Sequence, residues 1–468
     1  MSAEKFKQSL SLLDGTMIVA GSMIGSGIFI VSADMTRNVG SAGWLIATWL
    51  ITGFMTIAAA VSYGELSGMF PKAGGQYVYL KESYNPLVGF LYGWSFFAVI
   101  QTGTIAAVGV AFSKFTAYLI PGVSEDNILL SMGNFHISAA QLLSIATIIL
   151  LTYINTRGVK NGKLIQTSLT TIKLLALFGL IVFGILAAKG EIWNQNWSNA
   201  WDIHKLNKDG STQSYTLMAA MGAIAAAMVG SIFSSVAWEN VTFIAGEIKN
   251  PKRNVGLSLF LGTFIVTIVY VLANVMYMAV LPLQEMADAP KDRVAVSAAQ
   301  AIFGNAGTYV IAVLIMISTF GCNNGLILGG ARVYYTMAKD GLFFKQTGEL
   351  NKYAVPQFGL WIQCVVASLL CLSGKYGDLL DMVSFVVVLF YVLTIIGIFI
   401  LRKKRPDAER PYKAFGYPVI PVIYILLGLT FCSLLIMYKP QFTWPGLIIV
   451  LIGVPLYYIA VGRKKSVG

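Results

Sequence analysis

Charged residues are scarce in this 468-residue chain. Asp, Glu, Lys and Arg together make up 12% of it, about half the share of an ordinary soluble domain. Apolar and aromatic residues make up 56%, and the mean hydropathy is +0.71. A water-soluble core cannot bury that much apolar surface, so lipid must solvate most of the chain. The composition therefore excludes soluble enzymes as well as disordered and fibrous proteins.

Cysteine and histidine are also rare, with four and two residues. Cys322, Cys364, Cys371 and Cys432 lie in apolar stretches, and their spacing matches no metal motif, so we expect neither a metal site nor a disulfide framework. The apolar stretches contain no Asp pair, Ser–His pair or metal cluster, and the chain has no P-loop. We predict that the chain is not an enzyme and uses no cofactor.

The net charge of +12 does not indicate nucleic-acid binding, because the basic residues lie between apolar stretches and form no single patch. If both termini are cytoplasmic, the inner segments hold 23 Lys and Arg residues and the outer segments hold 8. That bias favours this orientation and places a basic face against anionic lipid. We predict an integral plasma-membrane protein, in the inner membrane of a bacterium, with both termini cytoplasmic.

Twelve stretches are long and apolar enough to cross a membrane as helices, which predicts an all-α membrane protein. They cover residues 12–33, 43–63, 86–119, 138–155, 164–188, 215–245, 256–281, 306–338, 354–374, 378–401, 417–437 and 442–462.

The first of these stretches contains a predicted helix break. Residues 21–27 read Gly-Ser-Met-Ile-Gly-Ser-Gly, and three glycines in seven positions weaken a helix. A break near the membrane midplane frees backbone N–H groups, which favour an anion such as a carboxylate. Close helix packing through small residues is the alternative, and Gly21 and Gly25 fit it.

The sixth stretch contains a weaker indication of a second helix break. It reads Phe233-Ser-Ser-Val-Ala-Trp-Glu-Asn, and the two serines can satisfy freed backbone groups. Glu239 is an ionisable residue deep in a span, and such residues usually face a cavity. The alternative is a continuous helix in which Glu239 faces a neighbouring helix.

Spans one and six occupy matching positions in two sets of five spans. An odd number of spans per set gives the sets opposite topology, and interrupted helices at matching positions indicate a midplane binding site. We therefore predict a first repeat over 12–188, a second inverted repeat over 215–401, and two additional helices over 417–462.

Three motifs in order resemble the L-type amino acid transporter family of the amino acid–polyamine–organocation superfamily. They are Gly25 to Phe29, Trp238 to Asn254 with Asn250-Pro251, and Arg402 to Pro411. The resemblance covers all the spans. It implies a LeuT-type fold with broken helices one and six and sodium-independent transport or exchange of amino acids.

The resemblance also implies a substrate site made mostly of backbone groups. The substrate carboxylate would meet the N–H groups of Ser26 and Gly27, with Ile24 and Gly25 beside them. The α-ammonium would meet backbone carbonyls of the second break, and the Phe233 ring would close over the substrate as an outer gate. The carbonyls concerned are those of Phe233, Ser234 and Val236.

Two departures from the family pattern fall in the second break. Ala237 stands where glycine is often found before this tryptophan, and Glu239 stands where asparagine is common. If Glu239 is ionised, it favours cationic substrates; if it is protonated, it resembles asparagine, and neutral substrates are preferred. We expect neutral substrates.

Lys173 lies too deep in the fifth span to reach the membrane surface. The resemblance places it where sodium-coupled relatives bind sodium, so its ammonium group could replace that ion. It would then bond to carbonyls of the first span and to polar groups near Ser318 and Thr319. A purely structural pairing is the alternative.

We predict a secondary transporter that exchanges neutral L-amino acids by alternating access. A proton-coupled or cationic amino acid transporter of the same fold is the first alternative, and a membrane nutrient sensor or channel is the second. Residues 120–137 lack the cysteine that joins related eukaryotic transporters to a heavy chain. The expected partners are therefore an amino acid and membrane lipid, without a disulfide-linked heavy chain.

Overall fold

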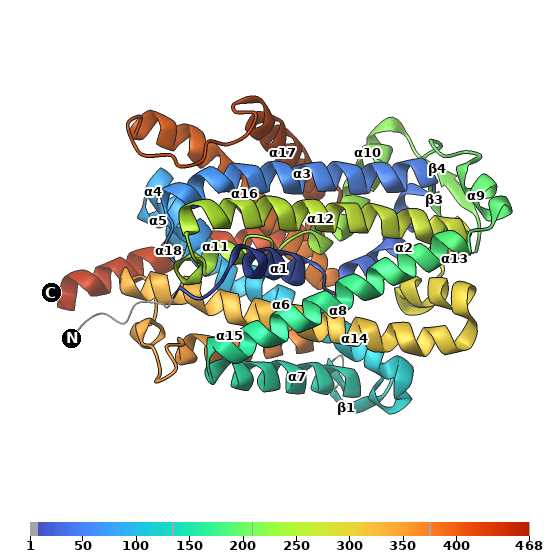
Figure 1. Cartoon of the computed structure of the whole chain (residues 1–468), viewed down its shortest axis with the longest axis horizontal. Helices are drawn as coiled ribbons and strands as arrows, with labels where there is room; N and C mark the ends of the chain where they lie inside the picture. Colours follow the sequence, from blue (N-terminus) through green and yellow to red (C-terminus); the bar gives the residue numbers. More distant parts are fainter. Residues whose placement is uncertain (1–7, 133–134, 208, 374–375, 468) are drawn as a thin grey trace.

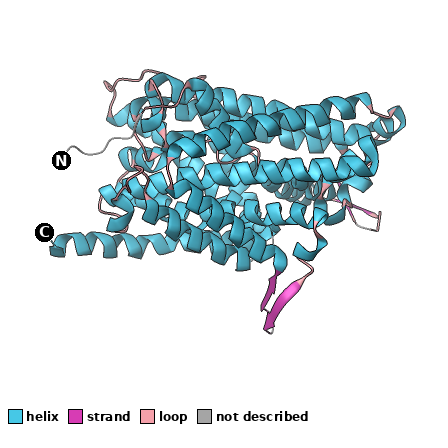
Figure 2. Cartoon of the chain, turned by 60° about the horizontal axis from the view of Figure 1, so that its bottom comes forward, coloured by secondary structure: helices cyan, strands magenta, loops and turns pink. Residues whose placement is uncertain are grey.

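The computed structural model describes residues 8–132, 135–207, 209–373 and 376–467, and most of this part is helical (Figure 2). Long helices run side by side along the longest dimension of the molecule (Figure 1). The end of the bundle at which α18 ends is called the terminal face here. The opposite end, which carries α9 and α13, is called the vestibule face (Figure 1).

The first half of the described chain forms nine helices: α1 (Leu12–Met23), α2 (Gly27–Val39), α3 (Ala42–Met69), α4 (Gly75–Ser83), α5 (Pro86–Ser95), α6 (Gln101–Leu119), α7 (Ala139–Thr156), α8 (Val159–Leu186) and α9 (Gly190–Trp197). A π-helical turn, Phe96–Ile100, joins α5 to α6.

The second half forms another nine: α10 (Leu217–Ser234), α11 (Asn240–Phe243), α12 (Pro251–Val280), α13 (Leu283–Ala287), α14 (Val294–Lys339), α15 (Gln357–Ser373), α16 (Tyr376–Lys404), α17 (Val419–Tyr438) and α18 (Pro440–Val467). Two short antiparallel hairpins pair β1 (Ile128–Met132) with β2 (Phe135–Ser138) and β3 (His204–Leu206) with β4 (Thr212–Ser214). The first hairpin projects from the bundle (Figure 2).

The all-α membrane fold is confirmed, and each of the twelve predicted stretches contains a helix. Within the described residues, ten helices are long and apolar enough to span a membrane, or eleven if the bent pair α1 and α2 counts as one span. The apolar helix α15 has 17 residues and is shorter than these. The number twelve therefore stays a prediction.

Helix α14 contains a kink that explains where its apolar span begins. Gly304 has φ 70° and ψ −164°, a conformation open mainly to glycine, and it separates a short first segment from the rest of α14. The span expected over 306–338 begins just after this kink.

The bundle is apolar outside and partly polar inside, as expected of a protein in lipid. Large side chains such as Phe178 of α8 and Leu426 of α17 are exposed on its surface. Ser, Thr and Asn side chains are buried between the helices, together with Lys173, Glu239 and Arg332. Some of the buried polar groups, such as Ser26 and Ser234, lie at the two breaks, and others are spread through the bundle.

Candidate substrate site

The first predicted break is present. Helix α1 ends at Met23, residues 24–26 are not helical, and α2 begins at Gly27 with its axis bent by 42°. The amide of Ile24 still closes the last turn of α1 on the carbonyl of Ala20 at 2.9 Å. The first N–H groups of α2 have no acceptors within their own helix and carry its positive dipole end.

The second predicted break is also present. Helix α10 ends at Ser234, the chain is irregular from Ser235 to Glu239, and only the four residues Asn240–Phe243 are helical again in α11. Ala237 has φ +68°, in the left-handed region that glycine prefers. The continuous helix considered as an alternative is wrong.

The two breaks touch each other at Gly27 and Ser234. A Cβ atom added to Gly27 would lie 2.0 Å from Oγ of Ser234 and 3.0 Å from its Cα. Glycine at position 27 therefore lets the start of α2 approach the end of α10. This contact brings the amide end of one helix beside the carbonyl end of another, which suits a ligand that carries both a negative and a positive group.

Tyr270 of α12 joins the two breaks, and sequence reasoning did not find it. Its hydroxyl oxygen lies 3.0 Å from the carbonyl oxygen of Met23 and 2.9 Å from that of Ser234. These carbonyls belong to the last residues of α1 and α10. Because a hydroxyl has one proton, it can donate fully to only one of them at a time.

A polar stripe on α12 could have revealed this contact. Tyr270, Asn274 and Tyr277 are spaced at i, i+4 and i+7, so they share one face of an otherwise apolar helix. Asn274 accepts a hydrogen bond of 2.7 Å from the hydroxyl of Ser32, and the Tyr277 hydroxyl donates to the carbonyl of Ile28 at 3.3 Å. The stripe thus contacts both halves of the first broken span.

Lys173 of α8 holds the first break from the side. Its ammonium group donates to the carbonyls of Gly21 at 2.5 Å and Ile24 at 2.6 Å, and the residue is only 1% exposed. The Ser318 hydroxyl of α14 lies 3.4 Å from the carbonyl oxygen of Ile24 and 3.3 Å from that of Gly25. Lys173 therefore makes the carbonyl contacts expected from the sequence.

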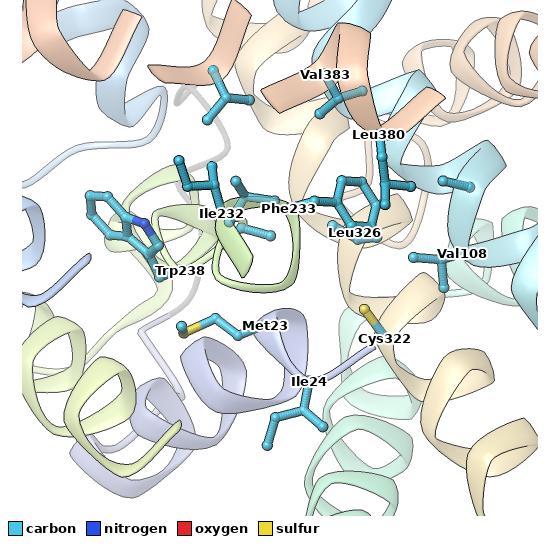
Figure 3. Close-up of a cluster of buried hydrophobic side chains, with 14 of the residues drawn as sticks. Met23, Ile24, Val108, Ile232, Phe233, Trp238, Cys322, Leu326, Leu380 and Val383 are labelled. Atoms are coloured by element: carbon cyan, nitrogen blue, oxygen red, sulfur yellow. The ribbon is translucent and has the colours of Figure 1, made fainter. Parts of the chain in front are cut away.

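Apolar side chains surround the two breaks (Figure 3). Phe233 points toward Leu380 of α16, Trp238 points the opposite way, and Met23 and Ile24 lie across from them in the same view. The remaining buried members labelled there are Val108, Ile232, Cys322, Leu326 and Val383. A ligand held at the breaks would meet hydrocarbon and a thiol on this side.

The family described as amino acid permease matches residues 10–459, nearly the whole chain. The chain belongs to the amino acid permease family. It is a transporter and not an enzyme, and it is integral to the plasma membrane.

Curated relatives of the permease align with almost all of it. The human protein named large neutral amino acids transporter small subunit 2 is 29% identical over 97% of this chain and 81% of its own length. The mouse Asc-type amino acid transporter 1 is 28% identical over the same shares. The human b(0,+)-type amino acid transporter 1 is 28% identical over 98% of this chain and 89% of its own.

Glu239 of the permease faces aromatic neighbours. Its Oε2 atom accepts a hydrogen bond of 2.6 Å from the hydroxyl of Tyr391 on α16, and the residue is 3% exposed. The rings of Tyr63, Trp238 and Tyr391 pack together, with centroids 4.8 to 6.0 Å apart. Glu239 therefore belongs to the wall of the second break on the side of Trp238.

A cavity of about 860 Å³ lies at the vestibule face of the permease. Val229 and Gly230 line it, about one helical turn before Phe233, and Leu380 lines it from α16. Its charged lining residues are Asp34, Arg37, Lys114, Glu125, Lys291, Asp292, Asp378, Asp381 and Lys439. Phe233 itself is buried and does not line this cavity.

Ion pairs hold the terminal face of the permease. Arg332 of α14 pairs with Glu247 at 3.3 Å, and both residues are buried. Lys81 of α4 pairs with Asp340 at 2.6 Å, and Tyr77 donates to the same carboxylate at 2.7 Å. Charged residues that line the cavity at the vestibule face are paired as well, Arg37 with Asp292 and Lys439 with Asp381, each at 2.8 Å.

Proposed function

We propose that the permease exchanges neutral L-amino acids across the plasma membrane, without sodium, by alternating access. The observation that carries the proposal is the contact between the start of α2 and the end of α10 at Gly27 and Ser234. Backbone donors and backbone acceptors meet there, beside a buried ammonium group, and an amino acid zwitterion complements both.

The carboxylate of the substrate binds at the first break. Its ligands are the N–H groups of Ser26 and Gly27 at the positive end of α2, with Ile24 and Gly25 shaping the approach. The substrate ammonium binds at the second break, where the carbonyls of α10 end. Its ligands are the carbonyl oxygens of Phe233, Ser234 and Val236.

Lys173 takes the place of a sodium ion. Its ammonium group occupies the position between α1, α8 and α14 and already bonds to the carbonyls of Gly21 and Ile24. A fixed positive charge at these carbonyls removes the need for a metal cation to hold the break in shape. The transport cycle then runs without sodium.

Apolar walls favour substrates with uncharged side chains. Val108, Cys322, Leu326 and Leu380 border the breaks near Phe233 (Figure 3). A charged side chain placed among them would lose its hydration without gaining a partner, which costs several kcal/mol by an order-of-magnitude estimate. One relative is named as a transporter of large neutral amino acids, which agrees with this preference.

Glu239 supports a second candidate, a cationic or proton-coupled transporter of the same fold. Its carboxyl group lies one residue past Trp238 and has one hydrogen bond from Tyr391. Competition of alanine, leucine and arginine for uptake at pH 6 and pH 8, in wild type and Glu239→Gln, separates the two. We expect neutral uptake to change little in Glu239→Gln. Loss of arginine competition alone would establish the second candidate.

The proposal is tested by uptake of labelled leucine into liposomes that contain the purified permease. Internal amino acid, sodium and pH are varied one at a time. We expect uptake to require internal amino acid and to be the same in sodium and potassium buffers. Uptake without internal amino acid that is driven by a sodium or proton gradient would refute exchange.

We propose the same membrane architecture as the sequence indicated. Two inverted five-helix repeats, 12–188 and 215–401, are followed by two additional helices over 417–462. The terminal face is cytoplasmic, and the membrane is the inner membrane of a bacterium. The permease works without a disulfide-linked heavy chain, because all four of its cysteines are buried in the bundle.

A further inference from the structure

Another pocket lies at the vestibule face, where α6 ends and α14 begins. Its volume is about 510 Å³. It is lined by Ala117, Tyr118, Pro121, Ser124, Asp126, Asn127, Lys291 and Arg293. Only Lys291 also lines the cavity of about 860 Å³, so the two are separate features of this face. None of the residues assigned to the two breaks lines this pocket.

Arg293, which directly precedes α14, is the buried cation of the pocket. The residue is 9% exposed, and its guanidinium group donates a hydrogen bond to the carbonyl of Lys114 in α6. Its Nε atom has no hydrogen-bond partner, and the residue forms no ion pair within the described part of the chain. A buried positive charge is costly unless a negative group accompanies it. The pocket therefore lacks an anion at Arg293.

The carboxylates near the pocket belong to Lys291. The Lys291 ammonium group pairs with Asp126 and, at 3.4 Å, with Glu125. Burial lowers the pKa of the Arg293 guanidinium, and the more distant charges of Glu125 and Asp126 offset this only in part. The charge of Arg293 thus remains available to a ligand.

Aromatic rings support the guanidinium group and indicate its depth in the membrane. The Cζ atom of Arg293 lies 6.0 Å from the ring centroid of Phe115 and 5.7 Å from that of Tyr118. The Tyr118 ring contacts Tyr309 of α14, with centroids 5.7 Å apart, and Tyr309 is 55% exposed. Exposed tyrosines on membrane helices gather at the level of the lipid headgroups. The pocket therefore lies where headgroups meet the protein.

We propose that this pocket binds a phosphate group, with Arg293 as its charged ligand and Lys291 as a second positive charge beside it. The planar N–H donors of a guanidinium group match the oxygens of a phosphate. At this depth a phospholipid headgroup supplies the phosphate, and a free phosphate ion is the other source of the same chemistry. The inference goes beyond the proposed function and does not depend on the identity of the substrate.

The site adjoins a contact that holds the first broken span. Asp292 lies between the two basic residues and accepts a hydrogen bond of 2.8 Å from Arg37 of α2. Arg37 also donates to the carbonyl of Ala287 at 2.6 Å. A ligand that contacts both Lys291 and Arg293 would hold the segment from which Asp292 reaches α2. We therefore expect a bound phosphate group to raise the midpoint of thermal unfolding.

Native mass spectrometry of the purified permease with added lipids gives the first test. The probes are phosphatidylethanolamine, phosphatidylglycerol and a diacylglycerol galactoside that has the same acyl chains and no phosphate. We expect wild type to bind both phospholipids at least about ten-fold more tightly than the galactolipid, because charge-assisted hydrogen bonds are the strong ones. Arg293→Gln keeps a polar side chain without the charge and should lose this preference.

Lys189→Gln is the matched control, because Lys189 is an exposed basic residue that directly precedes α9 on the same face. It should bind the three lipids as wild type does. Equal binding of phospholipids and galactolipid by wild type, together with the absence of any thermal shift on adding inorganic phosphate, would overturn the proposal. That comparison uses wild type alone, so it decides even if gel filtration shows that Arg293→Gln does not fold.

Inorganic phosphate distinguishes the two sources. The thermal midpoint of delipidated permease in detergent is measured with phospholipid, with inorganic phosphate, and with chloride at the same ionic strength. A rise with phospholipid alone, lost in Arg293→Gln and kept in Lys189→Gln, identifies the lipid headgroup as the ligand. A rise with inorganic phosphate that shows the same dependence on Arg293 identifies the free ion. A rise that persists in Arg293→Gln would show that the phosphate binds elsewhere and would refute the assigned site.

Discussion

The two helix breaks meet at one point but are built from different sequences. The first contains Gly21, Gly25 and Gly27, whereas residues 233–240 of the second contain no glycine. At the first break, the residues themselves disfavour a helix. At the second, Ala237 adopts a left-handed conformation that alanine does not prefer, so the surrounding fold must impose it.

The two breaks also differ in the side chains that contact their backbone carbonyls. Lys173, Ser318 and Cys322 reach the first break from α8 and α14 and approach its carbonyls. At the second, the carbonyl of Ser234 meets the hydroxyl of Tyr270. The first break is therefore a local property of its sequence, whereas the second depends on its neighbours.

The largest effect is expected where the breaks touch. Gly27→Val should reduce amino acid uptake to background, because its Cβ would overlap both the side chain and the Cα of Ser234. Valine is also restricted at χ1 and fills the space assigned to the substrate carboxylate. Even Gly27→Ala should lose most uptake. Labelled leucine uptake in liposomes measures both variants.

Gly179→Ala provides the control for this substitution. A Cβ there meets no atom within 4 Å, so the variant should transport like wild type. Amino acid amides should also compete poorly with free amino acids, because they lack the carboxylate. Wild-type uptake by Gly27→Ala, or equal competition by amides, would count against a carboxylate site at the first break.

Removing the side-chain support of the first break should have the next largest effect. Lys173→Ala removes the ammonium group that donates hydrogen bonds to the carbonyls of Gly21 and Ile24. Charged hydrogen bonds are worth roughly 1.5–3 kcal/mol each, so we expect at least about a ten-fold loss of exchange. The measurement is the rate of exchange at saturating internal substrate.

Lys189→Ala, in an exposed part of the chain, is the control and should exchange normally. The folded state of Lys173→Ala is checked by gel filtration, and removing sodium should not improve its activity. If wild-type exchange rises steeply with external sodium, Lys173 does not replace the ion.

The membrane-spanning helices and the first break could be predicted from the sequence. The length of an apolar stretch and its glycine content determine, within that stretch, whether a helix forms or is interrupted. Lys173 was also predictable, since a lysine that deep in a span must find acceptors within the protein. The second break could be suggested only by Ser234, Ser235 and Glu239. Its shape rests on the φ angle of Ala237, which no local rule assigns to alanine.

Tyr270 could not be assigned to the site from the sequence, because tyrosines in membrane spans are common and mostly pack or lie at interfaces. Its role depends on the relative placement of α1, α10 and α12, which is a tertiary property. The spacing to Asn274 and Tyr277 was a usable signal, although it indicates a polar face without naming its partners.

An intermediate effect is expected from the residue that joins the two breaks. Tyr270→Phe removes the proton shared between the carbonyls of Met23 and Ser234. A net hydrogen bond is worth about 1 kcal/mol, so exchange should fall several-fold and the thermal midpoint should drop by roughly 1–3 °C. Tyr309→Phe, at an exposed position, should change neither. An unchanged Tyr270→Phe would show that the breaks are coupled by packing alone.

The smallest effect tests the comparison most directly, through the backbone of the second break. Ala237→Gly places glycine at φ +68° and removes a left-handed penalty of roughly 1–2 kcal/mol, partly offset by the greater freedom of glycine in the unfolded chain. The net gain is about 0.5–1 kcal/mol, which should raise the thermal midpoint by roughly 1 °C and leave exchange almost unchanged. Ala227→Gly, inside helix α10, should lower the midpoint instead, because glycine costs about 1 kcal/mol in a helix. Opposite signs in these two thermal-shift measurements would show that the fold imposes the second break on an unfavourable residue. A destabilised Ala237→Gly would mean that its Cβ contacts outweigh the backbone penalty, and that the two breaks are less different than their sequences suggest.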